Sequence, residues 1–201
     1  LVPVLADMER TGVFIDAEYL ASYSDELSIV AKTLEEQIYE SAGGAFNINS
    51  SKQLQELLYT RLKLHELAGL KRLKKTKTGF STDESVLSQL APSHPIPDLI
   101  LQYRTVTKLK STYVDALPQF LNARSHRIHT HFNQTVAATG RLSSDKPNLQ
   151  NIPNQSPLGR RIRKAFKPPE ADAVLISADY SQVEIRLLAH LAEATDLIAA
   201  F

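Results

Sequence analysis

An apolar stripe in the first quarter of the chain places the strongest constraint on the fold. It lies between Asp16 and Ala42 at near-heptad spacing, and a helix with such a stripe must bury it against another helix. Asp16 is a suitable N-cap, and Gly43-Gly44 predicts the end of the helix. The members of the stripe are Leu20, Leu27, Val30 or Ala31, Leu34 and Ile38.

Residues 96–117 provide a partner for this helix. Their apolar side chains also recur at helical spacing, and Pro97 is tolerated in a first turn. We therefore expect the two helices to pack as a long antiparallel pair. The apolar positions of the second helix are Leu99, Tyr103, Val106, Tyr113 and Leu117.

The segment between the two helices is more polar and more basic. Residues 49–58 predict a capped helix start, where Ser51 and Lys52 are suited to bind a phosphate, although capping is the commoner role of such serines. Residues 71–77 carry five positive charges and predict a basic loop, and residues 82–87 predict another short helix.

Positive charge is distributed unevenly along the chain. The formal net charge is +1, but residues 141–167 hold seven basic residues against Asp145 alone, a net charge of +6. Arg104 and Lys108 stand one turn apart on the second long helix, where like charges repel slightly. A polyanion partner would explain both features, while a solvated basic face would also tolerate them.

The character of the sequence changes after Leu117-Pro118, where we place a domain boundary. Residues 127–132 alternate between apolar and polar side chains. This period of two predicts a strand that is exposed on one face.

Residues 139–153 are irregular and rich in hydrogen-bonding side chains. They carry Arg141 and three carboxamides, Asn148, Gln150 and Asn151. These residue types suit the minor groove of a duplex, whose acceptors are similar for every base pair. Turn chemistry is the alternative explanation, because Asn and Pro both favour loops.

A predicted strand-to-helix turn near the end of the chain is the clearest candidate for chemistry. Residues 174–178 form a short apolar run that predicts a buried strand, and the apolar spacing after Ser181 predicts a helix. Asp179 and Tyr180 would lie at the turn, a position suited to hold a metal ion. Helix capping is the alternative, because Ser181 and Glu184 have capping-box spacing and Asp179 would suit the helix dipole.

Composition excludes several classes of protein. The sequence has no cysteine, so disulfides and zinc-thiolate sites are excluded, and a reducing compartment fits. No apolar run approaches membrane-spanning length, and the N-terminus lacks the basic start of a secretory signal. Both ends of the chain fall inside apolar helical patterns, so we expect a piece of a longer protein.

Six motifs together resemble family A of the DNA polymerases, the bacterial DNA polymerase I type. They occur in order through essentially the whole chain, and each is fairly specific. The motifs are Gly12-Val-Phe-Ile-Asp16, Ser51-Lys-Gln-Leu-Gln, Lys108-Leu-Lys-Ser-Thr-Tyr113, Thr139 to Pro153, Gly159-Arg-Arg-Ile-Arg-Lys-Ala-Phe166 and Asp179-Tyr-Ser-Gln-Val-Glu-Ile-Arg186.

The resemblance implies an α+β right-hand polymerase fragment. Residues 1–15 would be a palm-proximal lead-in, residues 16–117 a mainly helical thumb with long antiparallel helices, and residues 118–201 the N-terminal part of a palm, with an antiparallel sheet and a packed helix, ending before the fingers. The implied reaction is template-directed nucleotidyl transfer by two Mg²⁺ ions. The implied partners are primer-template DNA, deoxynucleoside triphosphates and the rest of the polymerase chain, in the cytoplasm at a bacterial nucleoid and without a membrane.

The resemblance also implies roles for single residues. Asp179 matches the aspartate that binds both catalytic ions, and Tyr180 the neighbour whose backbone carbonyl joins one of them. The implied nucleotide pocket consists of Ser181, Gln182, Val183 and Glu184, the last beneath the incoming sugar. The implied DNA contacts are Arg141, Asn148, Gln150 and Asn151 in the minor groove, with Ser51, Lys52, Arg104 and Lys108 on the backbone.

The segment alone is expected to be catalytically incomplete, because the family supplies a second palm aspartate and the fingers from later segments. The alternative is a non-catalytic duplex-DNA-binding module from a truncated or degenerate polymerase. The presence of both Asp179 and Glu184 argues against a degenerate polymerase, since a protein that only binds DNA needs no carboxylate placed to bind a metal ion. A palm cut at this point should expose apolar faces near Val174 and Leu187.

Overall fold

The structure is a computed structural model that describes every residue except 71, 73, 77–78 and 171. The described residues form two compact units, Leu1–Lys167 and Pro168–Phe201. The predicted boundary near Leu117-Pro118 separates a thumb from a palm and differs from the division between these two units. It stays a prediction. The predicted basic loop of residues 71–77 lies partly outside the described residues.

Helix α2 (Ala17–Ala42) confirms the first prediction at both ends. The Asp16 carboxylate accepts a hydrogen bond from the Tyr19 N–H at 2.9 Å, and Gly43 ends the helix in the left-handed conformation with φ 71°. The stripe left open whether Val30 or Ala31 faces the partner helix, and the structure favours Ala31. Ala31 is partly buried and packs against the core, whereas Val30 is 42% exposed. The buried positions are Leu20, Tyr23, Leu27, Leu34, Ile38 and Ala42.

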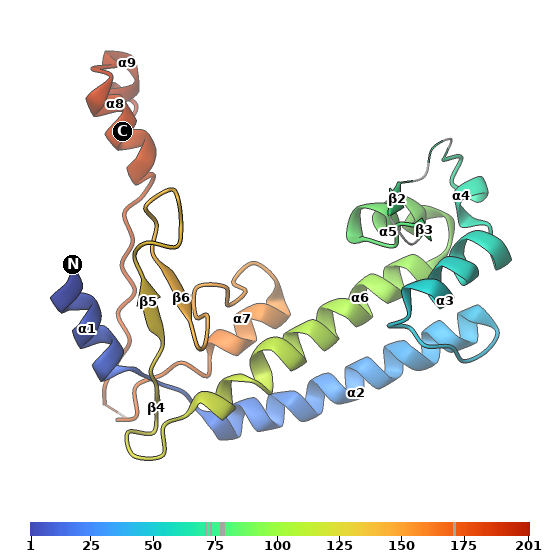
Figure 1. Cartoon of the computed structure of the whole chain (residues 1–201), viewed down its shortest axis with the longest axis horizontal. Coiled ribbons are helices and arrows are strands. Elements are labelled where there is room, and N and C mark those ends of the chain that lie inside the picture. The colour runs from blue at the N-terminus through green and yellow to red at the C-terminus, as the bar shows by residue number, and fades with distance from the viewer. Residues whose placement is uncertain (71, 73, 77–78, 171) are drawn as a thin grey trace. The chain divides into compact units, whose positions relative to one another are not determined.

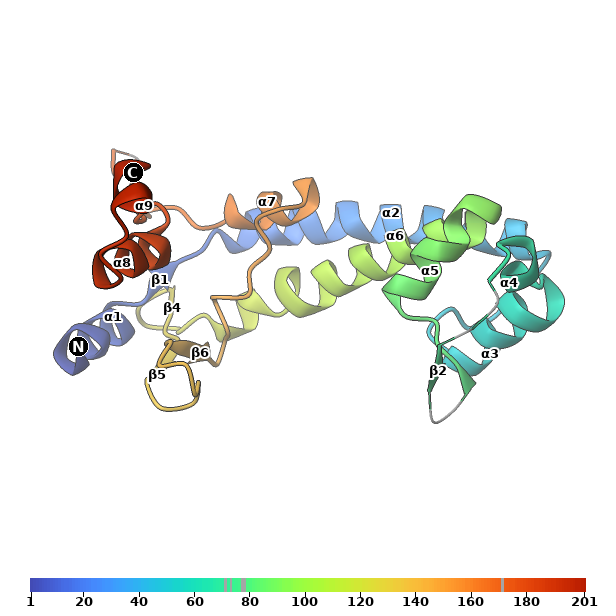
Figure 2. The ribbon, with the colours of Figure 1, turned by 90° about the horizontal axis from the view of Figure 1, so that it is seen from above.

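Helix α6 (Pro95–Leu109) lies beside α2 and runs in the opposite direction, as two views agree (Figures 1 and 2). The predicted helix of residues 96–117 is correct only as far as Leu109. A π-helical turn, η3 (Lys110–Val114), and a 3₁₀ turn, η4 (Leu117–Phe120), follow. Asp115 stabilises this wider turn, because its carboxylate accepts from Lys110 Nζ at 2.7 Å and from Ser24 Oγ at 2.6 Å.

Short helices form a tip at one end of the α2–α6 pair (Figure 1). Ser50 and Asp83 cap two of them, which confirms the predicted helix starts. A core formed by the tip and the adjoining ends of α2 and α6 includes Leu54, Leu58, Leu87 and other buried side chains. The elements of the tip are α3 (Ser51–Gln55), the π-helical η1 (Glu56–Arg61), α4 (Leu64–Leu67), β2 (Lys75–Thr76), β3 (Gly79–Phe80), α5 (Glu84–Leu90) and the 3₁₀ turn η2 (Ala91–Ser93).

The other end of the α2–α6 pair belongs to a second core, which forms the base of this unit. Two small antiparallel sheets complete it, because β1 pairs with β4 and β5 pairs with β6. The mixture of helices and antiparallel strands confirms the α+β class. The elements of the base are α1 (Val2–Thr11), β1 (Val13–Phe14), β4 (Arg127–Ile128), β5 (His131–Asn133), β6 (Ser143–Asp145) and α7 (Pro157–Arg163).

The predicted single strand of residues 127–132 is wrong in one respect, because the chain divides it between the two sheets. His129 and Thr130 lie between β4 and β5 and make other bonds. The Thr130 hydroxyl donates to the Asp145 and Pro147 carbonyls at 3.0 and 2.7 Å, and His129 Nδ1 bonds the Glu9 carbonyl at 2.8 Å. These bonds turn the backbone away from β1 and toward β6.

The N-cap of α2 predicts a dependence of stability on pH. A hydrogen bond from Lys167 and one from the Tyr19 N–H lower the pKa of Asp16 below its ordinary 3.8. A carboxylate with a lowered pKa stabilises the fold above its ordinary pKa, and that contribution is lost as the pH falls through the lowered value. We expect Asp16→Asn, which keeps the cap and removes the charge, to differ most from the wild type in free energy of unfolding near neutral pH.

Urea unfolding at several pH values measures this difference, which should shrink as the pH falls from about 5 to about 3. Asp16→Ala also removes the cap and should cost about 1 kcal/mol more than Asp16→Asn at every pH. A gap between wild type and Asp16→Asn that stays constant over this range would contradict the role of the Lys167–Asp16 ion pair.

The second unit, Pro168–Phe201, contains helices α8 (Val183–Leu191) and α9 (Thr195–Ala199). The predicted strand of residues 174–178 is wrong, because this segment has no regular structure. No strand in the described part of the chain pairs with it, and an isolated strand has no partner for its backbone groups. Its side chains are exposed, 78% for Val174 and 89% for Ile176, and Leu187 on α8 is also exposed, as predicted.

Capping by Ser181, the alternative interpretation of the start of α8, is not found. The helix begins at Val183, one residue later than a Ser181 cap would place it, and Gln182 precedes it in the left-handed conformation with φ 53° and no side-chain cap. The Ser181 backbone carbonyl instead accepts a hydrogen bond from Arg186 Nε at 3.0 Å. Among the described helices, none is both long enough and apolar enough to cross a bilayer.

Candidate nucleic-acid interface

The segment around β6 carries four of the predicted DNA contacts at the surface. Arg141 lies just before β6, and the carboxamides of Asn148, Gln150 and Asn151 lie just after it. All four side chains are exposed, so none of them has a role in the core. The structure therefore brings the three carboxamides together on one surface loop.

Two buried hydroxyl groups hold this loop from beneath. Ser144 accepts hydrogen bonds from the backbone N–H groups of Leu149 and Gln150, and Thr130 donates to two carbonyls at the start of the loop. Both residues are buried, with exposed fractions of 3% for Ser144 and 6% for Thr130. Internal bonds therefore set the path of the loop.

A third bond joins the loop to the end of the long helix. The Tyr113 hydroxyl, on η3, donates to the Asn151 carbonyl at 2.6 Å. A groove of about 420 Å³ lies between these elements, and Lys146 and Asn148 are also part of its lining. The carboxamide loop is thus attached to the α6–η3 segment as well as to β6.

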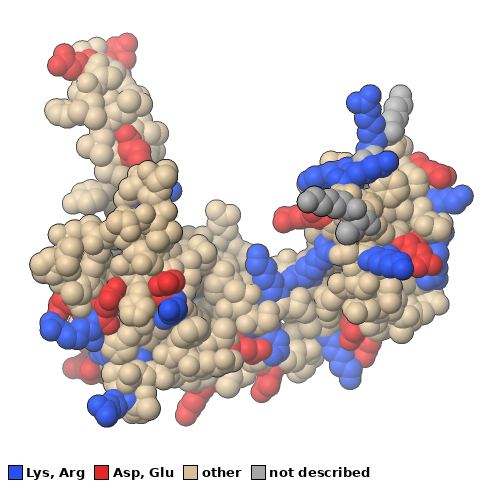
Figure 3. All heavy atoms as spheres, viewed as in Figure 1, with Lys and Arg blue, Asp and Glu red and all other residues tan. Residues whose placement is uncertain are grey.

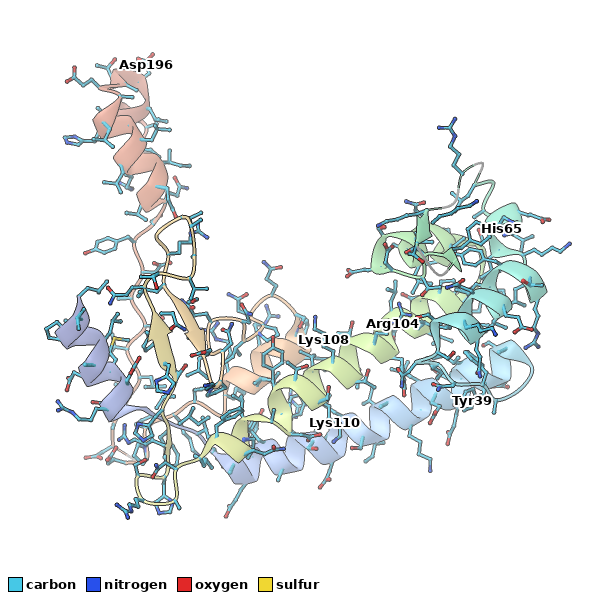
Figure 4. All side chains as sticks on the ribbon, viewed as in Figure 1. Tyr39, His65, Arg104, Lys108, Lys110 and Asp196 are labelled. Carbon is cyan, nitrogen blue, oxygen red and sulfur yellow. The ribbon has the colours of Figure 1, made fainter. Side chains whose placement is uncertain are left out.

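Arg104 and Lys108 line a second groove, of about 360 Å³, on α6. Arg104 is half-buried and donates to the backbone carbonyl and the hydroxyl of Thr82, and its burial lowers the pKa of the guanidinium. Lys108 is exposed and makes no ion pair with any described residue. Figure 4 labels both side chains on α6, and Figure 3 shows Lys and Arg side chains over the tip and along α6. Lys108 is therefore the more available of the two cations.

The predicted basic block of residues 141–167 does not form one cationic surface. Arg161 forms an ion pair with Glu26 at 2.8 Å and lies 4.1 Å from the centre of the Tyr23 ring. Lys167 pairs with Asp16 at 2.6 Å. These two cations attach α7 and the residues after it to α2, so part of the block has a structural role.

Ser51 and Lys52 lie apart from the carboxamide loop. They are exposed at the start of α3, in the tip, whereas the loop belongs to the base of the same unit (Figure 1). Ser50, rather than Ser51, caps this helix, and its hydroxyl accepts from the Gln53 N–H at 3.4 Å. The Ser51 hydroxyl is therefore not used for capping.

The second unit carries the candidate metal and nucleotide residues. Asp179 and Tyr180 are exposed and precede α8, and Ser181 to Glu184 lie at the start of that helix. The described residues contain no group of three or more His, Cys, Asp or Glu side chains arranged to hold a metal ion. The Asp179 carboxylate and the Tyr180 carbonyl offer oxygen donors, which fit Mg²⁺ in kind, and the ion commonly completes its shell with water and phosphate oxygens.

Three residues that shape the candidate interface were not predicted from the sequence. Tyr113 was assigned to an apolar stripe, although its hydroxyl reaches the carboxamide loop. Ser144 and Thr130 lie in segments whose patterns do not separate a buried hydroxyl from an exposed one. The one signal in the sequence is the large number of polar groups in the loop, because buried polar groups need hydrogen-bond partners within the protein.

The chain is similar to known proteins. Residues 17–201 match the model of DNA polymerase family A. The chain is 51% identical over 201 residues to DNA polymerase I of Synechocystis sp., covering all of this chain and 20% of the relative. It is 51% identical over 199 residues to the thermostable DNA polymerase I of Thermus thermophilus, covering 98% of this chain and 23% of the relative.

A solved structure is also similar. It is described as the POL domain of Pol1 from M. smegmatis in complex with DNA primer-template and dNTP. It aligns with 94% of this chain and 32% of its own, at a TM-score of 0.82 and 43% identity. The chain belongs to DNA polymerase family A. It spans about a fifth of the length of the curated relatives that it matches.

Proposed function

We propose that this chain is part of a DNA-directed DNA polymerase and that it holds the primer-template duplex. Residues 16–117 act as the thumb, residues 118–201 as the N-terminal part of the palm, and residues 1–15 as a lead-in to the palm. The observation that carries the proposal is the exposed loop after β6, whose three carboxamides are held in place by buried hydroxyls and by Tyr113. The similarity to a polymerase domain described with primer-template DNA supports it.

The two kinds of residue in the interface suit two parts of a duplex. Arg141, Asn148, Gln150 and Asn151 provide hydrogen-bond donors that suit minor-groove acceptors, which are present at every base pair. Cationic and hydroxyl groups on the helices suit phosphates, which carry most of the affinity and no sequence information. The phosphate contacts in this proposal are Ser51, Lys52, Arg104 and Lys108.

Asp179 is the proposed catalytic residue of the segment. Its carboxylate and the Tyr180 carbonyl would hold Mg²⁺, which activates a hydroxyl nucleophile and stabilises the charge on the transferred phosphate when it is bound. The start of α8 would form one wall of the pocket for a deoxynucleoside triphosphate. This wall consists of Ser181, Gln182, Val183 and Glu184. Two ions need more carboxylates than the described residues gather at this point, so the remainder of the polymerase chain is a required partner.

Salt dependence of binding tests the proposed grip on the duplex. We expect this chain to bind primer-template DNA with an affinity that falls linearly with salt on logarithmic axes. Lys108→Ala should reduce the slope by about 1, because one phosphate contact is lost. Fluorescence anisotropy with a labelled primer-template, measured over a series of salt concentrations, gives both slopes.

Lys110→Ala provides a matched control on the same segment of the chain, labelled in Figure 4. The Lys110 ammonium is already paired with Asp115 at 2.7 Å, so its removal should leave the slope unchanged. Equal slopes for wild type and Lys108→Ala would remove Lys108 from the interface. An absence of binding at low salt would reject the proposed function of the segment.

A further inference from the structure

The side chain of Ser144 is at the centre of the hydrogen bonds that shape the carboxamide loop. Its Oγ lies 3.1 Å from the Leu149 nitrogen and 3.4 Å from the Gln150 nitrogen. Backbone N–H groups only donate, so the hydroxyl oxygen is the acceptor in both bonds. The hydroxyl proton is then directed to Asn148 Oδ1, which lies 3.2 Å away.

These bonds fix the orientation of the Asn148 carboxamide. Asn148 Oδ1 also accepts from the Gln150 N–H at 3.0 Å. An amide nitrogen in this position would place donor against donor, so the atom must be the oxygen. The Asn148 nitrogen therefore lies on the other side of the group, on an exposed residue, and it bonds no described residue.

We propose that Ser144 is a positioning residue, which holds the Asn148 carboxamide with its N–H donors directed outward to the minor groove of the primer-template duplex. The inference rests on the proposed function and adds to it the direction of one hydrogen bond, in which the protein donates and the DNA accepts. Minor-groove edges present a purine N3 or a pyrimidine O2 acceptor at every base pair. A donor fixed in advance can bond any of them, whereas an outward oxygen would repel them.

A fixed donor also lowers the cost of binding. A free carboxamide would lose rotational freedom on contact with DNA, and half of its orientations would present the wrong atom. Ser144 is 3% exposed, so water does not compete for its hydroxyl. The bonds are complete before DNA arrives, and binding need not arrange them.

Removal of single acceptor atoms from the DNA tests this proposal. The probe is a set of primer-template duplexes of different sequence, which place a purine in turn at every position of either strand near the primer terminus. Each of these purines is replaced by its 3-deaza analogue, which has C–H in place of the N3 acceptor. Binding is measured for the wild-type chain, Ser144→Ala and Asn148→Asp. Asn148→Asp keeps the oxygen that bonds Ser144 and Gln150, replaces the donors by a second oxygen and adds a negative charge.

Asn154→Asp is the matched control, because it adds the same negative charge at an exposed asparagine a few residues further along. We expect one analogue position to weaken binding by the wild type and by Asn154→Asp about three- to tenfold, the contribution of a single hydrogen bond. Ser144→Ala and Asn148→Asp should bind that analogue and the natural duplex equally well. A purely structural role of Ser144 would weaken binding to both duplexes and leave their ratio unchanged.

Thermal unfolding of each variant identifies any that does not fold. Ser144→Cys, similar in size but a weak donor, replaces the alanine variant if that variant does not unfold cooperatively. Sensitivity to the analogue that persists in a folded Ser144 variant would overturn the positioning role. Wild-type binding that depends on salt but on no 3-deaza position would also overturn it and leave the proposed function intact. No binding of any duplex by the wild type would overturn both.

Discussion

Asp179→Asn is expected to lower primer extension by at least about a thousandfold, in a full-length family A polymerase into which this chain is exchanged for the matching segment. The amide keeps the size of the side chain and removes the negative charge that Mg²⁺ prefers in a ligand. The proposed DNA contacts lie in the Leu1–Lys167 unit, so the dissociation constant for primer-template should change little. Single-turnover extension with magnesium and all four deoxynucleotides, together with a binding titration, separates the two effects.

Asp196→Asn, on α9 and labelled in Figure 4, is the matched control in the same unit. It removes an exposed carboxylate that has no proposed role, and extension should stay within about twofold of the wild type, since isolated surface substitutions have small effects. Extension that survives Asp179→Asn would remove this residue from the reaction. A wild-type exchange protein that binds DNA tightly and extends no primer would favour the non-catalytic binding module.

Elements whose signals are local were predicted well from the sequence. Helix α2 needs only its own stripe, the Asp16 cap and Gly43, and all three lie within one continuous segment. The tip helices likewise begin at Ser50 and Asp83, residues whose side chains bond the backbone three residues further on. Such caps contribute the same bonds in any surrounding structure.

Elements whose signals depend on distant partners were predicted poorly. Residues 174–178 have the composition of a strand, but a strand forms only beside another, and no described strand adjoins them. The break in residues 127–132 depends on bonds from Thr130 to carbonyls fifteen and seventeen residues away. The turn η3 depends on Asp115 and Ser24, which are 91 positions apart.

The candidate site divides in the same way. Residue types identified the exposed carboxamides, because three such side chains in four residues are unusual in a core. The same reasoning gave Ser144 no role, although its buried hydroxyl bonds the Asn148 carboxamide oxygen. The sequence shows which side chains can donate or accept hydrogen bonds. Which of them face the interior depends on the path of the folded chain.

Tyr23→Ala is expected to lower the free energy of unfolding by about 3–5 kcal/mol, the range for truncation of a large buried aromatic side chain. Tyr23 is 1% exposed, and its hydroxyl donates to the Leu158 carbonyl at 2.9 Å. The Arg161 guanidinium lies over its ring, and the Tyr19 ring stacks on it with centroids 6.3 Å apart. One side chain thus joins α2 to α7, which follows directly on the carboxamide loop.

Tyr23→Phe separates packing from hydrogen bonding, because it removes only the hydroxyl and should cost about 1 kcal/mol. Tyr19→Phe is the matched control, since the Tyr19 hydroxyl donates to the Arg161 carbonyl at 3.1 Å from a less buried site and should cost less. Urea unfolding curves give the three differences. If Tyr23→Ala cost no more than Tyr23→Phe, the ring would contribute little, and the ion pair between Arg161 and Glu26 would be the main connection between α7 and α2. If the expected order is found, burial of the ring holds α7, and loss of DNA binding in Tyr23→Ala would then follow from displacement of the carboxamide loop.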